Sequence, residues 1–211
     1  MRLATWNVLN GTSLADGIVD APRLQRAAKA LSADVLGLQE VDRGQPRSHG
    51  LDLVAEVGEG TGAAAWRFVP ALIGTPGGSW RAAHSGDEAV EPVAYGVGLV
   101  SAHPVLAWHV LRMAPARVRS PIVLPGSRQL IWLQDEPRVA VAAVIDGPFG
   151  VMTVASTHLS FVPVWNAIQL RRLTRWLRLL PAVRGALPRL ALLGARDVPQ
   201  IEAAIRAAGP R

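Results

Sequence analysis

The sequence contains no cysteine, and Lys29 is its only lysine. Without cysteine the chain has no disulfide, no thiol nucleophile and no thiolate metal site. Arg, Pro or Gly interrupts every long apolar run, so no stretch is predicted to span a bilayer as a helix. Residues 1–7 lead into a predicted strand rather than into the charged and apolar segments of a signal peptide, and we therefore expect a cytoplasmic protein.

The chain is basic, with a net charge of +6 and a sequence pI of about 11.2, and nearly all of its cations are arginine. Arginine makes planar, bidentate contacts with phosphate and carboxylate, and a basic excess favours anionic partners. An arginine-rich composition would give the same excess without such a partner, so both explanations stay open. Half of the 211 residues are hydrophobic and 18% are charged, which predicts one folded domain over residues 1–211.

The hydrophobic pattern predicts many strands and fewer helices. Asp20 is placed to cap a first helix, with Pro22 in its first turn. Residues 74–91, rich in Gly, Pro, Ser and charge, are predicted to form a loop, and Gly147-Pro148 a hairpin turn. Apolar runs predict strands at residues 3–9, 35–39, 66–70, 95–101, 105–111, 129–133, 139–145, 151–156 and 189–194. Helical spacing predicts further helices at residues 51–57, 164–180 and 201–208.

The predicted elements indicate the fold class. Consecutive strands joined by turns favour antiparallel pairing, and amphipathic helices between them are expected to cover the outer faces. The helix at residues 164–180 carries Leu173, Trp176, Leu177 and Leu180 on one apolar face. We therefore predict an α/β fold that is a four-layer sandwich of two mixed β-sheets flanked by helices.

Three polar side chains follow predicted strands: Asn7, Glu40 and His158. The Asn7 amide can orient a phosphate or a carboxylate ligand, or can form a turn before the glycine-containing loop. Glu40 comes directly after an apolar strand, where its partner is either a divalent metal ion or an ordinary salt bridge. His158 can donate to a phosphate oxygen or to a backbone carbonyl. Because such strand ends commonly meet, the three side chains are predicted to share one site.

The order of the strand ends gives a resemblance to a known family. Residues 5–8 (Thr-Trp-Asn-Val), 38–41 (Leu-Gln-Glu-Val) and 156–159 (Ser-Thr-His-Leu) together resemble the ordered signature of the endonuclease/exonuclease/phosphatase family. Residues 95–101 resemble the middle strand of the family, and residues 136–138 resemble its arginine-bearing strand. The resemblance covers nearly the whole chain.

This resemblance implies a nuclease-like or phosphodiesterase-like hydrolase that depends on Mg²⁺ (or Mn²⁺), in which water attacks a phosphodiester or phosphomonoester in line. By resemblance, Asn7 binds phosphate and helps to hold the metal, Glu40 is the principal Mg²⁺ ligand, and His158 stabilises the developing negative charge. The implied partner is a phosphate-containing substrate: nucleic acid, a phospholipid head group or a small phosphoester. The basic charge tilts this choice towards nucleic acid.

The sequence departs from the family pattern near its end. The family has Gly-Asp-x-Asn after a late strand, where this chain has Gly194, Ala195, Arg196 and Asp197. Ala195 has no functional group, which leaves Asp197 as the candidate catalytic carboxylate of this segment. The terminal strand pair and Asp-His pair of the family have no counterpart before Arg211, so we expect a truncated or degenerate member. A second function therefore stays open, that of a catalytically impaired homologue that binds a phosphorylated ligand or partner.

Two further features have competing interpretations. Arg171, Arg175 and Arg178 recur at helical spacing, as a phosphate-contacting surface or as an ordinary solvated helix face. Most tryptophans lie in strand or helix patterns and are predicted to be in the core. Trp80 and Trp165 lie in or beside loops and are the candidates for base stacking.

Overall fold

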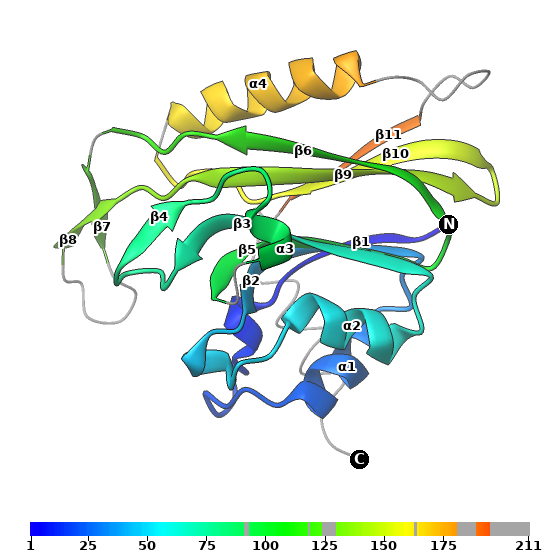
Figure 1. The fold of residues 1–211 in the computed structure, drawn as a ribbon, viewed down its shortest axis with the longest axis horizontal. Coiled ribbons are helices and arrows are strands. Elements are labelled where there is room, and N and C mark those ends of the chain that lie inside the picture. The colour runs from blue at the N-terminus through cyan, green and yellow to red at the C-terminus, as the bar shows by residue number, and fades with distance from the viewer. Residues whose placement is uncertain (91–92, 118, 124–129, 163, 181–188, 195–211) are drawn as a thin grey trace.

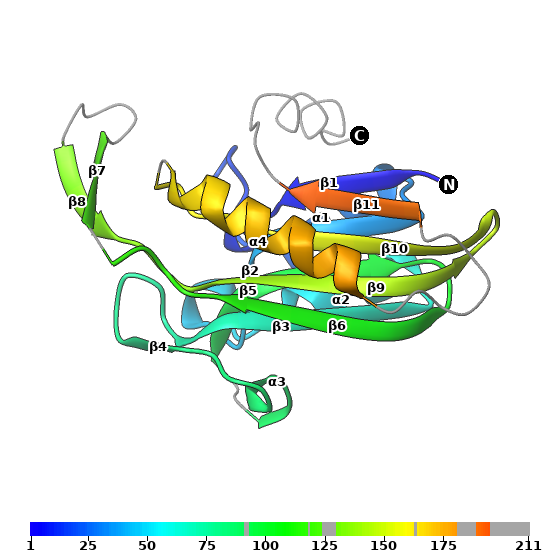
Figure 2. The same cartoon turned by 90° about the horizontal axis from the view of Figure 1, so that it is seen from above.

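The computed structural model describes residues 1–90, 93–117, 119–123, 130–162, 164–180 and 189–194. The predicted helix at residues 201–208 and the residues Ala195 and Asp197 lie outside these described residues. Within them the chain forms two mixed sheets that face one another, with helices on the outside (Figure 1, Figure 2).

The first sheet consists of β1 (Leu3–Asn7), β2 (Val35–Arg43), β3 (Ala65–Gly74), β4 (Trp80–Ala82) and β5 (Ala94–Ser101). Its five strands are ordered β1-β2-β5-β3-β4. β1 runs parallel to β2, and the other neighbouring pairs are antiparallel. Because β1 and β2 are parallel neighbours, the residues that follow them emerge at the same edge of the sheet.

The second sheet consists of β6 (Val105–Met113), β9 (Arg138–Gly147), β10 (Gly150–Thr157) and β11 (Arg189–Gly194). Its four strands are ordered β11-β10-β9-β6, with β10 and β11 parallel and the other pairs antiparallel. The predicted hairpin turn at Gly147-Pro148 does join β9 to β10. Two further strands, β7 (Arg119–Val123) and β8 (Leu130–Gln134), pair with each other and project from one end of the molecule (Figure 2).

The helices are α1 (Ala21–Ala30), α2 (Leu53–Thr61), α3 (Asp87–Val90) and α4 (Trp165–Leu179), with short 3-10 turns η1 (Leu9–Gly11) and η2 (Pro46–Ser48). α1 and α2 cover the outer face of the first sheet, and α4 covers that of the second (Figure 1). The predicted four-layer sandwich is therefore confirmed. Of the helices in the described residues, none has the length and apolarity needed to span a bilayer.

The layer between the sheets is an apolar core. Val35, Val69 and Leu99 enter it from the first sheet, and Val141 and Val154 from the second. All five side chains are fully buried. Burial of this kind fixes how the two sheets sit on each other, and so fixes the positions of the strand ends.

Local signals mark the starts of the first two helices, although α2, predicted over residues 51–57, runs over Leu53–Thr61. The Asp20 carboxylate caps α1 by accepting a hydrogen bond from the backbone N–H of Arg23 at 2.7 Å, with Pro22 in the first turn. Asp52 caps α2 in the same way, and Gly62 ends it in the left-handed conformation that favours glycine. These local signals explain why both helices were predictable.

β2 and β3 are longer than predicted. β2 was predicted over residues 35–39 and continues to Arg43, and β3 was predicted over residues 66–70 and continues to Gly74. The pairing of each strand with β5 shifts register part of the way along. A bulge inserts an extra residue, so the side chains beyond it point to the opposite face from the one that the alternation predicts. The predicted strands therefore stopped at the bulges.

The segment predicted as a loop at residues 74–91 contains β4 and α3. Glu88 of α3 is held by ion pairs with Arg67 at 2.6 Å and Arg112 at 2.9 Å. These contacts join positions far apart in the sequence, so no local pattern signalled them. β7 was also missed, because Pro121 at its centre weakens the strand signal.

Candidate active site

Glu40 lies at an irregular point of β2. The pairing of β2 with β5 shifts between Leu38 and Val41, so that Gln39 and Glu40 together face one residue and form a β-bulge. Glu40 has a φ of 53°, in the left-handed region that side chains of this size seldom occupy. The bulge leaves Leu38 and Val41 in one apolar core while the Glu40 carboxylate reaches a pocket. Strained backbone of this kind concentrates at functional sites.

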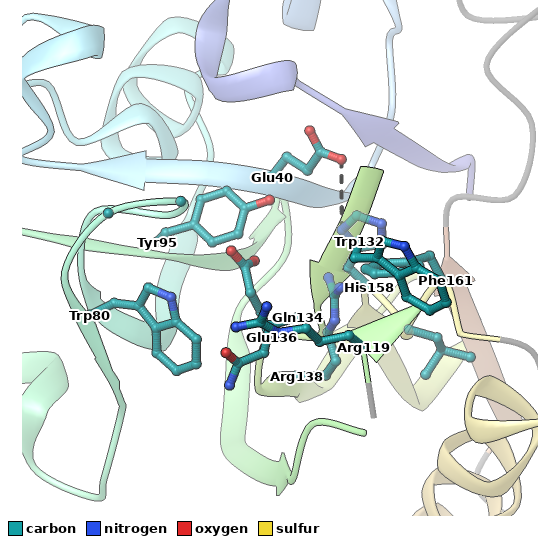
Figure 3. Close-up of a pocket in the computed structure, with 13 residues that line it drawn as sticks. Glu40, Trp80, Tyr95, Arg119, Trp132, Gln134, Glu136, Arg138, His158 and Phe161 are labelled. Carbon is teal, nitrogen blue, oxygen red and sulfur yellow. Dashed lines mark ion pairs between the residues drawn. The ribbon is translucent and has the colours of Figure 1, made fainter. Parts of the chain in front are cut away.

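The structure brings Asn7, Glu40 and His158 together. The Asn7 Nδ2 donates a hydrogen bond to the Glu40 Oε1 at 2.8 Å, and the Asn7 Oδ1 accepts one from the backbone N–H of Leu9 at 3.0 Å. His158 directly follows β10, and its Nδ1 lies 4.0 Å from the Glu40 Oε1, along the dashed line in Figure 3. The first sheet thus supplies Asn7 and Glu40, the second supplies His158, and the group spans the seam between the sheets.

Gln39 links the two sheets directly beneath this group. Its side chain is fully buried, and its Oε1 accepts a hydrogen bond from the Thr5 Oγ1 at 3.1 Å. Its Nε2 donates to the Ser156 Oγ at 3.1 Å. Thr5 lies two residues before Asn7, Gln39 lies one residue before Glu40, and Ser156 lies two residues before His158. Buried polar chains of this kind are rigid when fully bonded, so this one sets the separation between the two halves of the group.

The His158 imidazole is neutral at pH 7. Burial lowers its pKa to about 4, and the nearby positive charge of Arg138 acts in the same direction. Its 4.0 Å contact with Glu40 is therefore a contact between a neutral ring and a carboxylate. A neutral imidazole has one N–H donor and one acceptor nitrogen. It can orient a phosphate oxygen, but a full positive charge must come from elsewhere.

Glu40 and His158 line a pocket of about 580 Å³ (Figure 3). The pocket lies between the strand ends of the two sheets on one side and β4, β7 and β8 on the other. Trp80 was predicted as a stacking candidate and residues 136–138 match a family motif, whereas no pattern in the sequence indicated a site role for the other residues that line the pocket. The remaining lining residues are Gly77, Gly78, Tyr95, Arg119, Trp132, Gln134, Leu159 and Phe161.

Arg138 is the buried cation of this pocket. Its side chain is 8% exposed, one of its terminal nitrogens lies 3.3 Å from the Asp135 Oδ1, and its Nε has no hydrogen-bond partner among the described residues. Asp135 is fully buried and also accepts a hydrogen bond from the backbone N–H of Ala116 at 2.7 Å. The pair with Asp135 thus holds a guanidinium that lines the pocket, while its buried Nε stays unpaired among the described residues. Such a group is suited to bind phosphate.

The opposite wall of the pocket, at Tyr95, lies beside an ion pair between the buried Asp42 and the partly exposed Arg47. Arg47 donates to both carboxylate oxygens of the fully buried Asp42 at 2.8 Å each, and its guanidinium lies 5.6 Å from the centre of the Tyr95 ring. Burial and the charge of Glu40 raise the pKa of Tyr95, so its hydroxyl stays protonated. Burial also raises the pKa of Glu136, whose carboxyl lines the same pocket.

The donor set of the pocket can be compared with the needs of a divalent cation. Mg²⁺ takes one or two carboxylates and fills its other positions with water and substrate phosphate. Glu40 offers one carboxylate, and Glu136 lines the same pocket. Within the part of the chain that the structure describes, no three His, Asp or Glu side chains are grouped closely enough to enclose a metal ion. The site therefore suits Mg²⁺ or Mn²⁺ shared with a phosphate, and it does not suit a closed structural metal site.

The other predicted site residues lie outside the pocket or outside the described part of the chain. Asp197 and Ala195 lie outside the described residues, so Asp197 stays a prediction. Trp165 is tied down, because its Nε1 donates to the backbone carbonyl of Ala114 at 3.2 Å, and it does not line the pocket. The arginines at positions 171, 175 and 178 are exposed along α4, which leaves both of their interpretations open.

Comparison with solved structures shows the fold. The chain superimposes on an endonuclease/exonuclease/phosphatase from Beutenbergia cavernae with a TM-score of 0.54 at 24% identity, covering 84% of this chain and 43% of that one. A family protein from Leptotrichia buccalis gives a TM-score of 0.51 at 15% identity, over 90% of this chain and 66% of that one. The chain therefore spans less than two thirds of the length of either structure. A search of curated proteins found no match.

Comparison with family sequence profiles extends over most of the chain. The profile described as the endonuclease/exonuclease/phosphatase family matches residues 4–191, a range that contains Asn7, Glu40 and His158. The reactions in the family's name all break phosphoester bonds by hydrolysis. The match covers far more than half of the sequence, and the four-layer fold agrees with it. The chain therefore belongs to the endonuclease/exonuclease/phosphatase family.

Proposed function

We propose that this protein is a phosphoester hydrolase that depends on Mg²⁺ or Mn²⁺ and directs water in line at phosphorus. The observation that carries the proposal is the meeting of Asn7 and Glu40 from one sheet with His158 from the other, beside a pocket that also holds Arg138. Phosphoester hydrolysis requires a ligand for a divalent cation, a donor to a phosphate oxygen and compensation of the charge that develops. The four side chains offer these three functions, and family membership supports the same class of reaction.

Glu40 is assigned as the metal ligand. The bulge in β2 presents its carboxylate to the pocket, and the hydrogen bond from Asn7 at 2.8 Å fixes its orientation. A bound divalent cation supplies Lewis acidity to the phosphate and lowers the pKa of a bound water. Asn7 holds Glu40 through its Nδ2, and its Oδ1, which accepts one hydrogen bond from the backbone N–H of Leu9, keeps a second lone pair for the metal ion.

His158 and Arg138 are assigned to the phosphate oxygens. The neutral imidazole of His158 donates one N–H and adds no charge, because burial holds its pKa at about 4. Arg138 adds the positive charge, because its guanidinium lines the same pocket. His158 therefore orients the phosphate, and Arg138 compensates its charge.

A second function is favoured by one observation. Ala195 occupies the position where the family pattern has an aspartate, and alanine can neither activate a water molecule nor position one. The loss of such a group typically costs a factor of about 10² to 10⁴ in rate. A chain with this change could bind a phosphorylated ligand at Glu40, His158 and Arg138 without turning it over.

The test is hydrolysis of bis-p-nitrophenyl phosphate and of plasmid DNA with Mg²⁺ or Mn²⁺, comparing the unaltered protein with Glu40→Gln and His158→Asn. Matched controls change the same residue types at exposed positions, as Glu59→Gln on α2 and His49→Asn after η2. Metal-dependent turnover that both site variants lose and both controls keep would establish the hydrolase. Circular dichroism checks that every variant is folded.

No turnover above the Glu40→Gln background in a folded sample would sink the hydrolase proposal for this chain. The binding function then has its own measurement, which is calorimetric titration with inorganic phosphate in the presence of Mn²⁺. Binding that His158→Asn weakens would leave the non-catalytic homologue as the function.

A further inference from the structure

The pocket is walled by aromatic side chains beyond Glu40 and His158. The whole chain has seven tryptophans, three phenylalanines and one tyrosine, and two tryptophans, one phenylalanine and the tyrosine line this single pocket. Trp132 is 62% exposed and Phe161 is 40% exposed, so neither ring is explained by burial in the core. An exposed tryptophan beside a functional pocket is typical of a residue that contacts a ligand.

The aromatic rings face one another across the pocket. Trp80 belongs to β4, Trp132 belongs to β8, and Phe161 lies in the segment between β10 and α4. Figure 3 shows Trp80 on one side and Trp132 with Phe161 on the other. Arg119 and Gln134 lie between them and are paired in register on β7 and β8. The pocket, of about 580 Å³, has the size of a small-molecule site and is lined by both aromatic and polar side chains.

We infer that Trp80, Trp132 and Phe161 form a stacking site for a nucleobase whose attached phosphate lies at Glu40, His158 and Arg138. The inference rests on the proposed function, because that function identifies which end of the pocket takes the phosphate. Every base has a π face, so aromatic side chains bind bases largely irrespective of sequence. Bases of a duplex are already stacked inside it, so the ligand is a nucleotide or a single strand.

The position of Arg119 favours this ligand over other phosphoesters. The lining carries two carboxylates, Glu40 and Glu136, and two arginines, Arg119 and Arg138. A quaternary ammonium head group also binds between aromatic rings, but Arg119 pairs in register with Gln134 on the strand that carries Trp132, where its charge repels a cation. A sugar phosphate has no extended π face to use the tryptophans. A neutral ring on an anionic backbone satisfies both the aromatic walls and the guanidinium groups.

The test measures binding without turnover. The anisotropy of a short fluorescein-labelled oligothymidylate is titrated with the protein in EDTA, beside an abasic strand of the same length and charge. We expect the strand with bases to bind about 5- to 100-fold more tightly than the abasic strand. Trp132→Ala and Phe161→Ala should each reduce this advantage by about 5-fold or more and leave the abasic affinity unchanged. Phe149→Ala is the matched control, since Phe149 is 69% exposed at the turn between β9 and β10, away from the pocket.

Competition with thymidine monophosphate distinguishes two forms of the site. Full displacement of the strand indicates a site for a single nucleotide, and partial displacement indicates a site that also binds the flanking nucleotides. Equal affinity for the base-bearing and abasic strands would overturn the inference, as would equal or tighter binding of a duplex. Loss of binding to phosphatidylglycerol vesicles in Trp132→Ala, with oligonucleotide binding unchanged, would also overturn it in favour of a lipid surface. Because no step of this assay needs hydrolysis, its failure is distinguishable from failure of the hydrolase proposal.

Discussion

The two ends of the pocket are built in different ways. The end that holds Glu40 and His158 stands on long central strands, with Gln39 and Ser156 hydrogen-bonded beneath it. The aromatic end stands on short strands and a connecting segment, and its Trp132 is largely exposed. Chemistry at phosphorus tolerates little misplacement, whereas stacking tolerates much. In the proposed function, the fold therefore supplies a rigid chemical end and a peripheral recognition end that can vary at little cost.

The largest expected effect separates the two ends by activity. Glu40→Gln keeps the shape of the side chain and removes its negative charge, so we expect metal-dependent turnover to fall by about 10² to 10³. Calorimetric titration with Mn²⁺ should show that Glu40→Gln also binds the metal ion more weakly than the unaltered protein. Trp132→Ala should keep Mn²⁺ binding and the turnover of an abasic strand, which has no flat ring to stack on the tryptophan. A large loss of both in Trp132→Ala would show that the two ends are not separable.

The next effect concerns the contribution of the Arg47–Asp42 ion pair, which lies beside Tyr95, to the free energy of unfolding. Arg47→Met leaves the Asp42 carboxylate buried without its guanidinium partner, so the free energy of unfolding should fall by about 2 kcal/mol. This value is below the range for fully buried pairs, because the Arg47 side chain is 37% exposed to screening solvent. Urea unfolding measures the change, with Arg26→Met on the exposed face of α1 as the control. Equal losses in the two variants would mean that the Asp42 pair contributes nothing specific.

A smaller effect tests the link between the sheets. Gln39→Leu leaves the Thr5 and Ser156 hydroxyls without their partner, so unfolding should become easier by about 1 to 2 kcal/mol. Ser156→Ala should cost about 1 kcal/mol, and the double variant less than the sum of the two. Turnover should also fall in Gln39→Leu, although its side chain does not line the pocket. Additive stability changes with unaltered turnover would argue against a positioning role for Gln39.

The smallest effect is expected at the aromatic end. Trp132→Ala and Phe161→Ala should change the free energy of unfolding by less than about 0.5 kcal/mol, because both rings are exposed. Thermal and urea unfolding provide the measurement. A loss of several kcal/mol would assign these rings to the fold and would remove the contrast between the two ends.

Much of this architecture was readable from the sequence. The segments around Asn7, Glu40 and His158 were predicted to be strand ends because apolar runs stop there, and the structure places them together at the seam of the two sheets. Asn7 does end β1 and His158 directly follows β10, whereas Glu40 lies in a bulge inside β2, which continues to Arg43. The capped helices and the β9–β10 hairpin followed from local signals. The catalytic roles, the cytoplasmic location and the part played by Asp197 stay predictions.

The rest depended on contacts that no local pattern carries. The left-handed bulge at Glu40 results from a register shift against β5, and β4 and α3 are held by arginines from other strands. The burial of Arg138 against Asp135 likewise has no signature in a short window of sequence. Strand pairing and burial join distant residues, so they become visible only when the sheets are packed.

By itself, the sequence determined the fold class, the family and the three segments that carry Asn7, Glu40 and His158, because apolar periodicity and segment order are local properties of the chain. Only the tertiary structure decided which side chains share one pocket. It made His158 neutral through burial, left the buried Nε of Arg138 unpaired among the described residues, and set Trp80 opposite Trp132. The physical reason is that pKa values, desolvation and ring placement depend on neighbours in space rather than on neighbours along the chain.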